Sequence, residues 1–169
     1  MTFLDTGFLF ALVSKRDAHH ARVVEVFRTF RNLRLVDHLL TTNHVIAETI
    51  TLTLKVGHTE AARIGEQLYA ERLARIHWAS PEEERAAFAY FRRHQDQTYS
   101  FVDCLSFVVM QKLGISEALA VDSLLRSLFH MLPARERSTR SARRREPIFT
   151  PPVVDCSDLS VGLGGGGDR

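Results

Sequence analysis

The segment Phe3-Leu4-Asp5-Thr6-Gly7 begins with two apolar residues that run into a polar turn, and a second apolar run, residues 8–13, follows at once. This pattern predicts a short strand, a turn and a helix. Asp5 falls at the carboxyl end of the predicted strand. Because ligands of open parallel sheets bind at that end of the strands, Asp5 is a candidate functional residue.

The same succession of strand and helix recurs as far as Asp122. Further strands are predicted at residues 39–41, 75–78 and 118–121. Helices are predicted at residues 20–30, 43–56, 59–73, 81–94 and 101–113. Because each strand is followed by one or two helices, we expect right-handed crossovers and a parallel sheet covered on both faces, which is the α/β class.

Several helix ends carry specific signals. The tetrad Ser80-Pro81-Glu82-Glu83 combines a capping serine, a proline at the first helical position and a glutamate at the third. Gly57 and Gly114 are expected to end the helices that precede them. The helix at residues 101–113 is apolar on nearly every side, so we expect it to be buried.

Composition limits the class of protein. The 169 residues are 45% hydrophobic and 25% charged, which is typical of one globular domain with a sizeable core. The longest apolar stretch is interrupted by Asp103 and is shorter than the roughly 20 residues of a membrane-spanning helix. Cys104 and Cys156 form neither a zinc motif nor a disulfide framework, and no export signal opens the chain. A soluble cytoplasmic protein without membrane contact is predicted.

The composition changes at Pro133. Beyond that residue the chain is rich in Arg and Ser, then in Pro, and residues 164–167 are all Gly. The excess of positive charge, formally +2 for the whole chain, lies entirely in this segment. We therefore predict a folded domain at residues 1–132 and a disordered tail at residues 133–169.

Four acidic residues are expected at one edge of the sheet: Asp5, Glu48, Asp103 and Asp122. Clustered carboxylates repel one another, so such a site is tolerable mainly when a hard divalent cation neutralises it. Each residue also has a plain structural explanation as a helix cap or as an exposed side chain. Supporting hydrogen bonds are predicted from three neighbours that could equally be caps, namely Thr6, Asn43 and Ser100.

Asp103 is the case in which the two explanations compete most directly. Ser100-x-x-Asp103 matches a capping box, which needs no further chemistry. Burial of a carboxylate on an apolar helix, however, costs several kcal/mol, whereas a position near the helix N-terminus returns only about 0.3–1 kcal/mol. A bound metal would balance that deficit.

Four motifs together resemble the PIN-domain family, and in particular the VapC-type toxins. They are Phe3-Leu4-Asp5-Thr6, residues 42–49 (Thr-Asn-His-Val-Ile-Ala-Glu-Thr), Ser100-Phe101-Val102-Asp103-Cys104 and Ala118-Leu119-Ala120-Val121-Asp122. The resemblance implies a three-layer α/β/α sandwich with a short-stranded parallel sheet, a Mg²⁺ or Mn²⁺ site and hydrolysis of single-stranded RNA. It also implies a cognate antitoxin and a homodimer.

By position, Asp5, Glu48, Asp103 and Asp122 match the acidic quartet of that family. We expect Asp5 and Asp103 to be the inner metal ligands, and Glu48 and Asp122 to act through water or to orient the nucleophile. The residues after Asp122, Ser123-Leu124-Leu125-Arg126, depart from the family pattern.

The predicted function is therefore that of a Mg²⁺-dependent endoribonuclease, the toxin of a type II toxin-antitoxin system. A phosphatase of the haloacid-dehalogenase type is disfavoured because it needs a second Asp two residues after the first, where this chain has Gly7. No Gly-rich phosphate loop follows the first strand. The alternative left open is a catalytically impaired PIN-like module that binds RNA or a protein partner.

Overall fold

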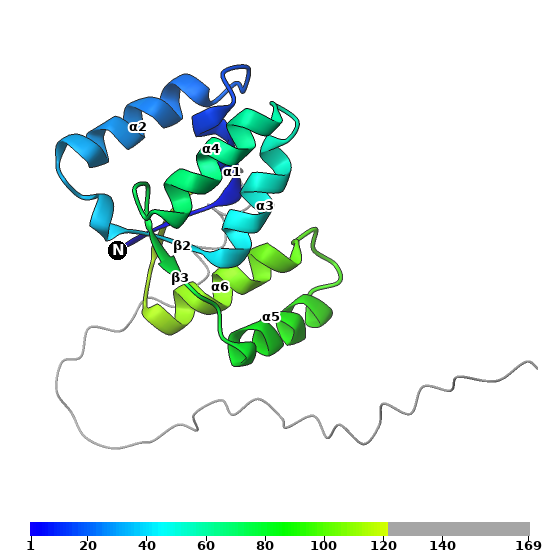
Figure 1. Cartoon of the computed structure of the whole chain (residues 1–169). Helices are drawn as coiled ribbons and strands as arrows, with labels where there is room; N and C mark the ends of the chain where they lie inside the picture. Colours follow the sequence, from blue (N-terminus) through cyan, green and yellow to red (C-terminus); the bar gives the residue numbers. More distant parts are fainter. Residues whose placement is uncertain (122–169) are drawn as a thin grey trace, which may run out of the picture. The chain divides into compact units, whose positions relative to one another are not determined.

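The computed structural model describes residues 1–121, which form a four-stranded parallel sheet with helices on both faces (Figure 1). The strands are β1 (Thr2–Leu4), β2 (Leu39–Thr42), β3 (Arg75–His77) and β4 (Glu117–Leu119). The helices are α1 (Thr6–Val13), α2 (His20–Asn32), α3 (Asn43–Thr53), α4 (His58–Tyr69), α5 (Pro81–Arg93) and α6 (Phe101–Leu113), and a 3₁₀ helix, η1 (Val36–His38), precedes β2. The predicted α/β sandwich is confirmed. Asp122 and the predicted tail lie outside the described residues.

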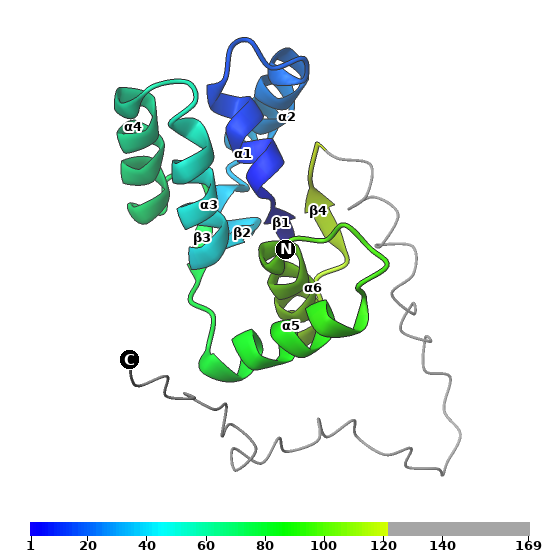
Figure 2. The same cartoon turned by 90° about the vertical axis from the view of Figure 1, so that its right-hand side faces the viewer.

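The strand order is β3-β2-β1-β4, and all neighbours are parallel. The chain steps in one direction from β1 to β3 and then crosses back to place β4 on the other side of β1. Since parallel crossovers are right-handed, this order puts α1 to α4 on one face and α5 and α6 on the other, as Figure 2 shows. The direction reverses next to β1, and open sheets bind ligands where it does so.

The hydrophobic core is built around the short strands β1 and β2. All four residues of β2 are buried, because this strand has neighbours on both edges and helices on both faces. Phe3 and Leu4 of β1 are also buried, and they belong to the same cluster as Ile46 of α3 and Leu68 of α4. The carboxyl ends of β1 and β2 are thereby fixed in a rigid layer.

The helix signals in the sequence were mostly reliable. At the start of α5, the Ser80 N–H donates to Glu83 Oε2 at 2.7 Å and the Glu83 N–H donates to Ser80 Oγ at 3.3 Å. Gly114 ends α6 with a φ of 66°, a conformation that suits glycine. The predicted end of α3 was wrong: the helix stops at Thr53, because the N–H groups of residues 54–56 bond three residues back and tighten the chain into turns.

The prediction that α6 is buried is confirmed for most of the helix but not for its last turn. Its apolar residues are shared between two clusters, one around the sheet and one between α5 and α6. Neither cluster covers the last turn, so Lys112 and Leu113 are exposed, and Asp103 in the first turn is only half-buried. Within the described part of the chain, no helix is long and apolar enough to span a bilayer.

Candidate active site

Asp5 lies where β1 ends and α1 begins, at the carboxyl edge of the sheet. Its Oδ2 accepts a hydrogen bond from the Gly7 N–H at 3.1 Å, so it caps α1, and the residue is only 7% exposed. Burial raises the pKa of Asp5 from 3.8 to about 6. The Gly7 and Thr6 N–H groups oppose this rise, while the charges of Asp103 and Glu48 add to it. The charges of two acids from distant segments therefore act on Asp5.

Glu48 is held beside the start of α1 by a hydrogen bond. Thr6 Oγ1 donates to Glu48 Oε2 at 2.5 Å, although the residues are 42 positions apart. The contact forms because α1 and α3 pack together on the same face of the sheet. Thr6 thus orients the carboxylate of Glu48 next to Asp5, which agrees with a supporting role for Thr6.

Asp103 enters from the opposite face, in the first turn of α6. Its Oδ2 accepts from the Ser100 N–H at 2.7 Å, and its own N–H donates to Ser100 Oγ at 3.1 Å, so the predicted capping box is present. A carboxylate has about four lone-pair positions, and the cap uses part of this capacity. The half-buried Asp103 can therefore cap α6 and also face a ligand. The burial penalty that we expected for Asp103 applies to Asp5 instead, because Asp5 is the more deeply buried of the two.

The donors around Asp5 suit a hard cation, because Asp5, Glu48 and Asp103 offer only carboxylate oxygens. A cation beside the buried Asp5 would stabilise its ionised form, which burial disfavours. Within residues 1–121, however, no three His, Cys, Asp or Glu side chains come close enough together to enclose an ion. The fourth acid of the predicted quartet, Asp122, lies outside this range. The donor chemistry fits Mg²⁺ or Mn²⁺, but the described carboxylates do not close on one point.

Comparison with known proteins decides the family. The family model described as "PIN domain" matches residues 2–129, which include all four acids of the predicted quartet. The chain belongs to the PIN-domain family. The sequence-based resemblance is thereby confirmed.

Relatives of this PIN domain are VapC proteins. The "23S rRNA-specific endonuclease VapC20" of Mycobacterium tuberculosis, matched in strains CDC 1551 and H37Rv, is 34% identical over 123 residues, which cover 72% of this chain and 89% of the relative. The "VapC ribonuclease" of Archaeoglobus fulgidus is 28% identical over 153 residues, covering 85% and 94%. The crystal structure of M. tuberculosis VapC20, titled a sarcin-ricin loop cleaving toxin, matches with a TM-score of 0.66 and 30% identity, covering 76% and 95%.

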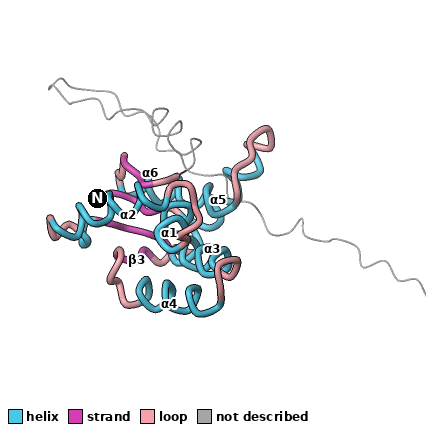
Figure 3. The backbone as a smooth tube through the Cα atoms, turned by 90° about the horizontal axis from the view of Figure 1, so that it is seen from above, coloured by secondary structure: helices cyan, strands magenta, loops and turns pink. Residues whose placement is uncertain are grey.

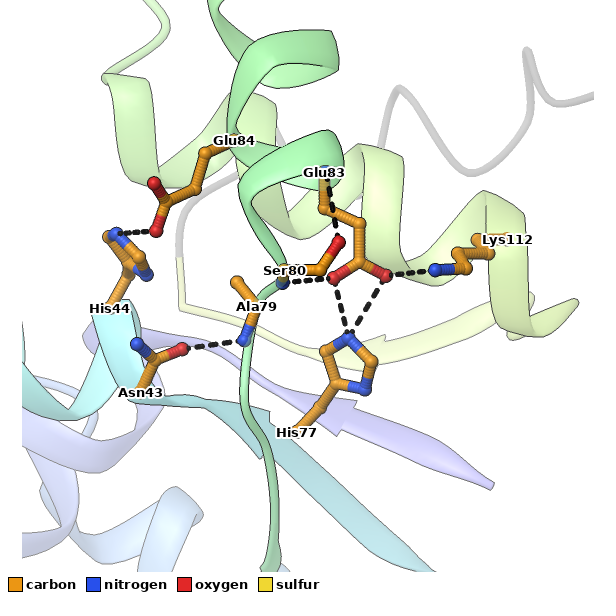
Figure 4. Close-up of polar contacts among 8 residues, drawn as sticks. All are labelled: Asn43, His44, His77, Ala79, Ser80, Glu83, Glu84 and Lys112. Atoms are coloured by element: carbon orange, nitrogen blue, oxygen red, sulfur yellow. Dashed lines mark hydrogen bonds and ion pairs between the residues drawn. The ribbon is translucent and has the colours of Figure 1, made fainter.

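Beyond the acids, this PIN domain has a polar network that fixes β3 to α5 and α6 (Figure 4). Glu83 is only 3% exposed, and its carboxylate accepts hydrogen bonds from Lys112 Nζ at 2.8 Å and the Ser80 N–H at 2.7 Å. It also contacts His77 Nε2 at 3.0 Å. Burial alone would raise the pKa of Glu83, but these partners outweigh it and lower the pKa to about 2.

The sequence identified Glu83 only as a cap. Its partner Lys112 is 29 residues away, and their pairing depends on how α5 and α6 pack, which no local pattern records. Its other partner, His77, ends β3, and this position at a strand terminus was the one local signal available.

Asn43 and His44 connect the start of α3 to neighbouring elements. Asn43 Oδ1 accepts from the Ala79 N–H at 3.0 Å, so this oxygen holds the chain after β3. His44 Nε2 lies 3.4 Å from Glu84 Oε1, and its ring meets Phe101 of α6 edge-on. His44 Nδ1 is buried without a partner among the described residues. His44 was not singled out from the sequence, although it precedes Glu48 by one helical turn.

Proposed function

We propose that this VapC-type ribonuclease cleaves single-stranded RNA with a Mg²⁺ or Mn²⁺ ion held by Asp5, Glu48, Asp103 and Asp122. One observation carries the proposal. Asp5 is buried where the strand order of the parallel sheet reverses, and the charges of Glu48 of α3 and Asp103 of α6 act on its carboxylate. Asp122 is included on sequence position alone. Asp5 and Asp103 are proposed as the inner ligands, and Glu48 and Asp122 as acids that act through water.

The chemistry follows from the donors. A divalent cation held by Asp5, Glu48, Asp103 and Asp122 would polarise the scissile phosphate and lower the pKa of the attacking water. The protein holds its carboxylates in fixed positions: the cap of α1 orients Asp5, the Thr6 hydroxyl orients Glu48, and the capping box with Ser100 orients Asp103. Glu48, and Asp122 by its sequence position, are proposed to act through water or to orient the nucleophile.

The substrate and partners are proposed by analogy. The M. tuberculosis relatives are named for cleavage of 23S rRNA, and the related crystal structure for cleavage of the sarcin-ricin loop. We propose an RNA loop of the same class as the substrate, in the cytoplasm, with a cognate antitoxin that restrains the enzyme and a homodimer as the assembly. Residues 133–169 are proposed to be dispensable for the chemistry.

The test compares the full chain with Asp5→Asn and Asp103→Asn. Each change preserves the shape of the side chain and removes its charge. With a synthetic sarcin-ricin RNA and an unstructured RNA, both variants should lose at least about 100-fold in kcat/KM, because divalent-ion catalysis contributes several kcal/mol. EDTA should abolish cleavage by the unaltered chain.

Asp37→Asn is the matched control. Asp37 is exposed and precedes β2, at the opposite edge of the sheet from Asp5, so its loss should leave cleavage unchanged. Isothermal titration should detect Mn²⁺ binding to the unaltered chain and weaker binding to Asp5→Asn and Asp103→Asn. RNA binding without cleavage in any metal would instead favour the impaired binding module.

A further inference from the structure

Trp78 is the single tryptophan of the chain, and it is 61% exposed. Exposure alone does not mark a binding residue, because single exposed apolar side chains are common; the position of Trp78 in the fold is what distinguishes it. Trp78 comes directly after β3, at the carboxyl edge of the sheet that also carries Asp5. Nothing in the proposed cleavage chemistry uses it.

The register of the sheet relates Trp78 to the acids. Thr42 is level with His77, and β1 and β2 pair at Phe3 and Leu40, so continuing that register by two residues brings Asp5 level with Thr42. Neighbouring strands are about 4.8 Å apart, so the row from β1 to β3 spans roughly 10 Å. Trp78 stands one residue beyond that row, within reach of a nucleotide next to the cleaved bond.

A ring contact and a backbone hydrogen bond of the next residue limit the position of Trp78. Tyr69, the last residue of α4, stacks on it with ring centroids 6.4 Å apart and planes inclined by 28°. Helix α4 runs beside β3, which makes this contact possible (Figure 3). The next residue, Ala79, is bound through its N–H to Asn43 in the first turn of α3. The exposed ring is therefore oriented before any ligand arrives.

We propose that Trp78 stacks on a base of the RNA strand that flanks the cleavage site. The inference rests on the proposed ribonuclease function and adds a binding residue to it. Every base has a π-face, so such stacking supplies affinity without sequence preference. Exposed charges of both signs flank Trp78, with Arg72 and Arg75 before it and Glu82 in the first turn of α5 after it. The inference therefore rests on the aromatic face and its position, not on net charge.

The single tryptophan gives a direct readout. In the full chain with Asp103→Asn, which blocks cleavage, titration with a single-stranded RNA should quench the emission of Trp78 until the site is saturated. The matched ligand is a ribose-phosphate oligomer of equal length without bases, which should leave the emission unchanged. Equal responses to the two ligands, or no response while anisotropy reports RNA binding, would overturn the inference.

A kinetic comparison tests the same contact in the active enzyme. Trp78→Ala should raise KM for RNA by roughly 5- to 100-fold, the range for loss of one stacked base, and leave kcat within about twofold. Trp78→Phe should recover most of the affinity. Phe88→Ala, which removes another exposed aromatic from α5, should leave KM unchanged. Circular dichroism establishes that each variant is folded.

The outcomes separate this inference from the proposed function. Cleavage with an unchanged KM in Trp78→Ala would refute the stacking role but not the proposed ribonuclease function, and contact with a protein partner would then be the explanation for Trp78. Absence of cleavage in every metal would refute the proposed function, while the emission of Trp78 would still decide whether the residue contacts a base.

Discussion

Asp5 shows how a single residue can be unfavourable for folding and suited to catalysis. Its carboxylate is almost fully removed from water, and its raised pKa, about 6, records the cost of keeping it charged. A structural cap would not need this charge, because asparagine caps helices equally well. The cost is understandable if the charge has a ligand to hold.

Thr6 donates a hydrogen bond to Glu48, so the proposed role of its hydroxyl is to position that carboxylate. Thr6→Val removes the hydrogen bond to Glu48 but preserves most of the side-chain volume. We expect kcat to fall by about 10- to 100-fold, the usual effect of losing a group that orients a metal-binding carboxylate, and KM for RNA to change little. Steady-state cleavage of a short RNA measures both constants.

Two variants control for the loss of a hydroxyl. Thr6→Ser keeps the donor and should recover much of the activity. Thr51→Val removes an exposed hydroxyl whose partner is the carbonyl of Ala47 in its own helix, and it should leave kcat unaffected. An unaltered kcat in Thr6→Val would mean that Glu48 needs no such orientation.

At the scale of elements, Glu83 joins β3, α5 and α6. Its pKa in the folded protein, about 2, lies below the ordinary 4.5, so its contribution to stability is complete above about pH 4.5 and is lost as the pH falls towards 2. We expect this acid-labile part to be about 1–3 kcal/mol, since Lys112 is partly exposed to solvent. Urea unfolding of the unaltered chain and of Glu83→Gln, between pH 2 and 7, measures it.

Glu83→Gln should be less stable than the unaltered chain at pH 7, and the difference should shrink as the pH approaches 2. Glu82→Gln is the neighbouring control, because Glu82 is exposed and its ion pair with Arg85 lies on the surface. Its effect should be negligible beside that of Glu83→Gln, because surface ion pairs contribute little to stability. A pH-independent difference for Glu83→Gln would show that the network is not electrostatic.

The elements also show what a sequence can predict. The start of α5 at Ser80 and the end of α6 at Gly114 were found because their signals are local and involve adjacent residues. The class of fold followed from the alternation of strands and helices. A supporting hydrogen bond from Thr6 was predicted, but its partner Glu48 was not, and neither was the bond from Lys112 to Glu83, because both partners are brought together by helix packing. The exposure of Asp103 was misjudged for the same reason.

At the scale of the whole chain, the strand order explains why acids from remote segments lie at the same edge of the sheet. Helix α1 leaves β1 towards one face, and α6 approaches β4 along the other, so both helix N-termini point to the same edge of the sheet (Figure 2). Asp5 and Asp103 occupy these two N-termini, where helix dipoles favour negative charge. The fold can therefore concentrate carboxylates that a single element could not hold together.

This concentration of charge should make the stability of the chain depend on divalent ions. A ligand that binds only the folded state at about 100 times its Kd adds about 2.7 kcal/mol, and for a chain of 169 residues this corresponds to a rise in Tm of roughly 5 °C or more. We expect Mn²⁺ to raise the Tm of the unaltered chain relative to EDTA, as measured by calorimetry. Asp5→Asn should abolish most of this rise.

With Mn²⁺ we expect the unaltered chain to be more stable than Asp5→Asn, and in EDTA we expect the opposite. Asp5→Asn should then melt at a higher temperature than the unaltered chain, because an amide costs less to bury than a carboxylate and still accepts the hydrogen bond from Gly7. Loss of a purely structural residue would lower the Tm with and without the ion. A lower Tm for Asp5→Asn in both conditions would thus assign Asp5 a purely structural role. A lower Tm with Mn²⁺ but a higher Tm in EDTA requires that the Asp5 carboxylate binds the cation.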